Sequence, residues 1–223
     1  MRKTVFMLFL CLLGAFLNIL LIIFKARTGH PLFLNTVFTI ALTMLGGLFW
    51  GALCGALTNL VAHSIWFWGW EGYLFAICSV ITALVTWLFI RLFPRELNLE
   101  QAELHVTHSW VQMRKSRRLG TVIDRMVVLI LLSFCLCLAM SVSGGLIAAL
   151  IQIFNKSVTG NPDISIIMSA TMFSQNLSII LREILSRIPI NIIDCLVSGF
   201  AGYGIALGLY SIPALRGLLR RIA

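Results

Sequence analysis

Long apolar runs, separated by short polar or basic stretches, dominate the chain. Six of these runs have the length and composition of membrane-spanning helices, because about 20 apolar residues are needed to cross the hydrocarbon core. We expect the spans at residues 5–24, 32–45, 48–67, 72–90, 126–154 and 189–211. The second run is short, and a Gly46-Gly47 turn connects it to the third. The fifth run is longer than a bilayer requires, and we expect Gly144-Gly145 to bend or break it.

Two stretches between the runs are less apolar. Residues 91–125 form a long hydrophilic loop that is rich in arginine. Residues 165–188 mix apolar residues with ionisable ones, so we predict an amphipathic or re-entrant helix there. The pattern therefore predicts an all-α integral membrane protein. Residues 1–223 would form a single membrane domain, a six-transmembrane-helix bundle with an extra helix before the last span.

Composition agrees with a membrane protein. Hydrophobic residues make up 60% of the chain and charged residues only 11%, with a mean hydropathy of +0.99. An average soluble domain is about 25% charged, so soluble globular and disordered proteins are excluded. The net charge of +9 would suggest nucleic acid in a soluble protein. Here the basic residues lie between apolar spans without a base-stacking motif, so we expect the lipid bilayer and no nucleic acid as partner.

The distribution of basic residues predicts the orientation. Six crossings place both termini on the same side of the membrane, and cytoplasmic loops carry an excess of lysine and arginine. With the termini and the loop 91–125 in the cytoplasm, twelve of the 17 basic residues lie inside and five outside. We therefore predict a multi-pass protein with two cytoplasmic termini.

Polar residues within the runs gather at one level of this topology. Such residues are costly in hydrocarbon and usually face the bundle interior or a water-filled cavity. In the predicted orientation they all fall in the outer half of the membrane, where we expect them to line a substrate-binding pocket that is closed toward the cytoplasm. Interhelical hydrogen bonding alone is the alternative. The candidate substrate-binding residues are Asn18, Asn35, Asn59, His63, Glu71, Gln152, Asn191 and Asp194.

Glycines recur at intervals of four residues in two of the runs. At 3.6 residues per turn, such glycines share one helix face and let a second helix approach closely. In the third run, Asn59 and His63 continue the same interval. The predicted helix-packing residues are Gly47, Gly51, Gly55, Gly204 and Gly208.

Sequence motifs for catalysis or metal binding are missing. The chain has no H-E-x-x-H, G-x-S-x-G or phosphate-binding loop, so we do not expect an enzyme. Its six cysteines lie in apolar runs without a C-x-x-C pair, and buried cysteine behaves as a small hydrophobic residue. His105 and His108 share a predicted helix face, but a third metal ligand is not evident. We expect no metal, cofactor or disulfide framework.

Several segments carry a resemblance to a known family. They are residues 31–40 (PLFLNTVFTI), 45–60 (LGGLFWGALCGALTNL), 144–160 and 188–198. With these segments the chain resembles the substrate-binding (S) components of energy-coupling-factor (ECF) transporters, which include vitamin-uptake-like membrane proteins. The resemblance implies a six-helix bundle in a bacterial cell (inner) membrane with an outward-facing pocket. It also implies capture of a vitamin-like small molecule, which enters the cell after docking on a scaffold membrane subunit with two ATPases.

Two other functions fit the same pattern. Some relatives in that family occur as sensor domains, so the protein could report ligand occupancy through the basic loop 91–125. It could also be a structural subunit of a membrane complex, with its glycine stripes packed against partner helices and no ligand.

Overall fold

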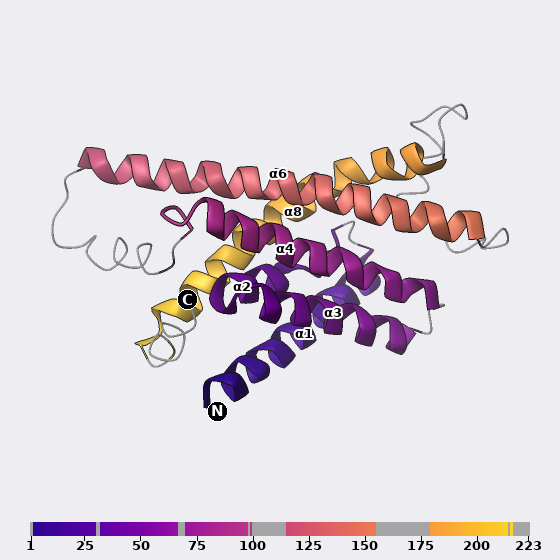
Figure 1. The fold of residues 1–223 in the computed structure, drawn as a ribbon, viewed down its shortest axis with the longest axis horizontal. Helices are drawn as coiled ribbons and strands as arrows, with labels where there is room; N and C mark the ends of the chain where they lie inside the picture. Colours follow the sequence, from indigo (N-terminus) through magenta and orange to yellow (C-terminus); the bar gives the residue numbers. More distant parts are fainter. Residues whose placement is uncertain are drawn as a thin grey trace.

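A computed structural model describes residues 2–29, 32–66, 70–97, 99, 115–154, 179–213 and 215. Five helices in this part of the chain are long and apolar enough to cross a membrane, and α2 is a shorter apolar helix. The predicted all-α membrane bundle is therefore confirmed. The elements, shown in Figure 1, are α1 (Arg2–Thr28), α2 (Val37–Gly46), α3 (Leu48–Trp66), the 3-10 helix η1 (Trp70–Phe75), α4 (Ala76–Leu92), α6 (Lys115–Phe154) and α8 (Ile179–Ser211).

The bundle is apolar outside and partly polar inside. Large apolar side chains such as Phe9, Phe16 and Phe134 are exposed, whereas Asn18 and Thr58 are completely buried. This distribution suits a lipid environment, where the outer surface gains nothing from polar groups and interior polar groups must find partners. The short helix α2 lies at the centre, in contact with α1, α3, α4 and α8.

The second span differs from its predicted form. Residues 32–36 are not helical, and α2 alone rises only about 15 Å, half the hydrocarbon core. However, Phe33 lies against Lys25 of α1, and Gly46 lies against Met7 of the same helix. From Met7 to Lys25, α1 rises about 27 Å. The non-helical segment and α2 together therefore cover nearly one membrane thickness.

The last span is longer than predicted. Helix α8 begins at Ile179, ten residues before the predicted start, and Pro189 lies inside it. Residues 179–188 thus continue the last span, and their assignment to a separate amphipathic or re-entrant helix is wrong. Neighbouring helices allow a proline within a membrane helix, because they compensate for the lost backbone hydrogen bond. Residues 165–178 of that predicted helix lie outside the described residues.

Helix α6 is not broken at Gly144-Gly145. A Cβ atom at Gly145 would lie 2.8 Å from the backbone N and Cα of Ile184, so this glycine permits close contact between α6 and α8. Helix α6 also begins at Lys115, so residues 115–125 of the predicted loop are helical. Residues 100–114 of that loop, with His105 and His108, lie outside the described residues.

Two glycines of the stripe predicted on α3 lie at close contacts with neighbouring helices. A Cβ at Gly55 would lie 2.7 Å from Ser79 Cβ, and one at Gly51 would collide with the Thr43 side chain. These two glycines therefore bring α3 close to α4 and α2. Gly47 has a different role: it precedes α3 with a φ of +85°, a conformation that suits glycine, and forms the turn after α2.

The glycine stripe predicted on the last span makes no close helix contact among the described residues. A Cβ at Gly204 or Gly208 would meet no atom within 4 Å. The close contacts of α8 are made by other glycines: a Cβ at Gly202 would lie 2.8 Å from Ile40 Cγ2, and one at Gly199 would lie 2.6 Å from Ser133 Oγ. Gly204 and Gly208 share a spacing of four residues, but no described residue packs closely against them on that face of α8.

Candidate ligand-binding site

Polar side chains from different helices meet at one end of the bundle. This end, the Arg187 end, is formed by the C-terminal halves of α1, α3 and α6 and the N-terminal halves of α2, α4 and α8. Buried apolar side chains, including Met7, Leu129 and Leu132, fill the other halves of these helices. The structure thus places a polar layer at one end, with an apolar core beside it.

Asn18 joins three helices through its amide. Its Nδ2 donates to Thr39 Oγ1 at 3.4 Å and to Thr58 Oγ1 at 3.3 Å. Its Oδ1 accepts a hydrogen bond from the Phe38 backbone N–H, which lies in the first turn of α2 and has no partner within that helix. Asn18 therefore connects α1, α2 and α3 and caps α2 from outside.

Asn59 and Asn191 also bridge helices. Asn59 Nδ2 donates to Ser79 Oγ at 2.6 Å, which joins α3 to α4, and to the Gly55 carbonyl at 3.0 Å. Asn191 Nδ2 donates to Ser141 Oγ at 2.9 Å, which joins α8 to α6. The asparagines thus make the interhelical hydrogen bonds that we considered as the alternative to ligand binding, and ligand contact stays a prediction for them.

Asp194 holds the non-helical segment between α1 and α2. Its Oδ1 accepts a 2.8 Å hydrogen bond from the Leu34 backbone N–H, and the Phe33 N–H also donates to this carboxylate. Leu34 has a φ of +50°, the only positive φ among the described non-glycine residues. Lys25, whose Nζ lies 3.5 Å from the Phe33 ring centroid, adds a favourable charge interaction with Asp194. Asp194 thus compensates backbone donors that no helix satisfies.

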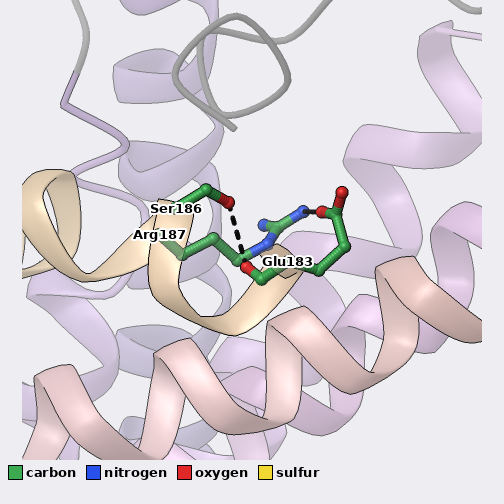
Figure 2. A network of polar contacts seen from close by, with 3 residues as sticks. All are labelled: Glu183, Ser186 and Arg187. Carbon is green, nitrogen blue, oxygen red and sulfur yellow. Dashed lines mark hydrogen bonds and ion pairs between the residues drawn. The ribbon is translucent and has the colours of Figure 1, made fainter. Parts of the chain in front are cut away.

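His63, Phe75, Glu183 and Arg187 form a cluster, which we name the Arg187 cluster. Arg187 reaches across the bundle from α8, so that its guanidinium carbon lies 5.9 Å from the Phe75 ring centroid. Phe75 stacks in turn on His63, with ring centroids 6.5 Å apart. Figure 2 shows Arg187 and Glu183 turned toward each other over one turn of α8, with 3.8 Å between Nη2 and Oε2.

The remaining candidate residues contribute less to this picture. Asn35 is half-buried in the segment between α1 and α2. Glu71 lies in η1 and Gln152 near the end of α6, but their side chains are outside the described part of the structure.

Sequence reasoning missed Glu183 and Arg187 as members of the site. The sequence pattern places both in an amphipathic or re-entrant helix, whereas in the structure Glu183 is 2% exposed and Arg187 16%. Their spacing of four residues, which places two side chains on one helix face, could have revealed the pair. The hydroxyl partners Thr58, Ser79 and Ser141 were also missed, because serine and threonine occur throughout these helices.

At the opposite end of the bundle, Arg125 makes a polar contact with the chain after α4. Arg125 Nε donates to the Glu96 backbone carbonyl at 3.0 Å, and its guanidinium carbon lies 6.0 Å from the Tyr203 ring centroid. Arg125 thus ties the start of the loop after α4 to α6 and α8.

No protein family, curated protein or solved structure matches this chain. Within the described residues, no three His, Cys, Asp or Glu side chains lie together in a group that could hold a metal ion. Among the described residues, the Arg187 end therefore offers amides, hydroxyls, the Asp194 carboxylate, the rings of His63, Tyr73 and Phe75, and the Arg187–Glu183 ion pair. Such groups can bind a small polar molecule.

Proposed function

We propose that the protein is a membrane substrate-binding subunit that captures a small vitamin-like molecule from outside the cell. The observation that supports this most directly is the Arg187 cluster: Glu183 is buried and Arg187 is half-buried in a helix that is apolar enough to span a membrane. Ionisable residues inside membranes are costly and usually mark a binding site or a transport path.

The arrangement suits capture at one face. A ligand enters at the Arg187 end, stacks against Phe75 and His63, and hydrogen-bonds to the polar side chains there. The apolar core around Leu129 and Leu132 prevents the ligand from crossing the bundle without the help of partner proteins. Release on the other side then requires partners, which the family resemblance suggests are an ECF scaffold subunit and ATPases.

The test is ligand binding by the purified protein in lipid nanodiscs. We expect one member of a panel of water-soluble B vitamins to raise the unfolding temperature, and the Asn59→Leu substitution to weaken its binding at least tenfold. Ser211→Ala is the matched control, because Ser211 is exposed at the far end of α8 and bonds only to the Gly208 carbonyl in the described structure. The unfolding temperature without ligand reports whether Asn59→Leu alters the fold.

Two results would contradict the proposal. If no compound shifts the unfolding temperature and no small molecule copurifies, a structural subunit becomes the better interpretation. If a ligand binds but Asn59→Leu has no effect, the ligand occupies a different place.

A membrane sensor is the second candidate function. It is favoured by Arg125, which connects Glu96 at the start of the basic loop to Tyr203 on α8. Through this contact a change in the bundle can reach residues 91–125. Copurification separates the two functions, since a transporter subunit retains a scaffold and ATPases, whereas a sensor retains a signalling protein.

A further inference from the structure

We propose that the captured molecule carries a negatively charged group, a carboxylate in the simplest case, and that Arg187 binds it. This inference rests on the proposed capture function and specifies its ligand. It is based on the position of Arg187, on its unused hydrogen-bond donors and on the charge balance around it.

Arg187 is aimed at the centre of the Arg187 end. Besides Phe75 of η1, it approaches α6 at Gly144, where a Cβ would lie 3.7 Å from Arg187 Nη1. It also lies near enough to Cys78 of α4 for a charge interaction. The guanidinium therefore sits where η1, α4, α6 and α8 meet.

The guanidinium has unused hydrogen-bonding capacity. Its Nε is buried and donates no hydrogen bond within the described structure. The contact with Glu183 measures 3.8 Å, longer than the 2.7–2.9 Å or so that is usual for a hydrogen bond between charged groups. A buried charged donor without an acceptor is unfavourable, and the planar guanidinium matches a carboxylate in two parallel hydrogen bonds.

The local charge is also unbalanced. Among the described side chains on this stretch of α8, Arg182 and Arg187 carry positive charge and Glu183 carries the opposite charge. Arg182 Nε, like Arg187 Nε, is buried without an acceptor in the described part of the chain. An anionic ligand compensates the excess positive charge, whereas a cationic ligand increases it.

The rings beside Arg187 define the rest of the ligand. The Phe75 ring lies near both the guanidinium and the His63 ring, and Tyr73 lies edge-on to His63 at 6.2 Å. These rings offer an apolar, partly aromatic surface next to the charged donor. The ligand class that fits is a small carboxylic acid with a flat or apolar body.

The experiment compares acids with their neutral counterparts. Binding of nicotinate and nicotinamide, pantothenate and panthenol, and biotin and biotinamide is measured by calorimetry on the nanodisc protein. Small molecules that copurify are identified by mass spectrometry. We expect an acid to bind at least tenfold more tightly than its neutral counterpart, and Arg187→Gln to remove this preference. Arg187→Lys should retain part of it.

Two further variants separate ligand binding from structural support. Glu183→Gln removes the competing carboxylate, so binding of the acid should stay equal or become tighter. Arg91→Gln removes one positive charge from an exposed site at the other end of α4 and should change nothing.

The outcomes distinguish this inference from the capture function. A bound or copurifying ligand that is neutral or cationic, or an acid whose affinity Arg187→Gln leaves intact, overturns the inference alone. Equal losses of affinity in Arg187→Gln and Glu183→Gln also overturn it, because they indicate a structural ion pair. If no compound binds and none copurifies, the capture function fails, and the inference fails with it.

Discussion

Asn18 is buried in an apolar helix, yet both sides of its amide are hydrogen-bonded. We expect Asn18→Leu to lower the free energy of unfolding by about 1–3 kcal/mol, because the half-buried Phe38 N–H loses its acceptor and two threonine hydroxyls lose a donor. Denaturant titration of the protein in mixed micelles measures the change. Thr28→Ala is the control, since this exposed hydroxyl bonds only to the Phe24 carbonyl one turn earlier. Equal stability of the Asn18 variant and wild type would show that the bridge contributes nothing.

The hydrogen bond between Asp194 and the Leu34 backbone N–H leads to a second prediction. In Asp194→Ala the Leu34 N–H loses its 2.8 Å bond to a carboxylate. Such a bond contributes about 1.5–3 kcal/mol, so exchange of the Leu34 amide hydrogen should accelerate about 10- to 100-fold. Asp194→Asn keeps an oxygen acceptor and should show a smaller effect. Hydrogen–deuterium exchange over residues 32–36 checks this, and unchanged exchange in Asp194→Ala would contradict the assigned role.

For each interhelical hydrogen bond, the sequence predicted only one of the two partners. Asn18 and Asn59 stand out in their helices because an amide side chain in a membrane span needs a partner. Their partners Thr58 and Ser79 do not stand out. A helical hydroxyl can bond to the carbonyl one turn earlier, as Thr58 does to Cys54, so its presence indicates no partner on another helix.

Among whole elements, the limits of α3 were predicted almost to the residue, whereas α2 and α8 were not. Helix α3 follows a glycine turn and ends in an aromatic stretch, and both features are visible in the sequence. The wrong prediction of a helix at residues 32–36 has a physical reason. Hydropathy indicates which residues are buried, but a non-helical backbone can also be buried when a side chain such as Asp194 accepts its hydrogen bonds. At α8, the sequence predicts that the helix starts at Pro189, although packing inside a bundle permits proline in a helix interior.

The contact between α6 and α8 depends on one glycine. In Gly145→Ala the new Cβ meets the backbone of Ile184, which cannot move without shifting α8. We expect a loss of about 1–3 kcal/mol in the free energy of unfolding. Gly204→Ala is the matched control, because its Cβ meets no atom within 4 Å and alanine favours the helix by up to about 1 kcal/mol. A Gly145→Ala protein as stable as the control would mean that the two helices are not packed this closely.

For the whole molecule, the sequence sufficed for the membrane class and for the bundle but not for the site. The membrane class depends on how many residues are apolar and on how they are grouped into long runs. Both are properties of the sequence alone. The Arg187 cluster depends on which helices are neighbours, because Phe75 and Arg187 come from η1 and α8, more than 100 positions apart. The side chains of this cluster form an ion pair and stack on one another, partly between different helices. A local sequence pattern does not predict such contacts.

Capture from outside requires the Arg187 end to face the exterior, and cysteine labelling tests this orientation. We expect Thr28→Cys, at the end of α1 beside the Arg187 end, to react with a membrane-impermeant maleimide in intact cells. Ser116→Cys, in the basic stretch that begins α6, should react only after permeabilisation. The six native cysteines are buried or half-buried and should give little background. The reverse pattern would place Arg187 on the cytoplasmic side, where it could not take up an external ligand, and would contradict the proposed function even if binding were measured.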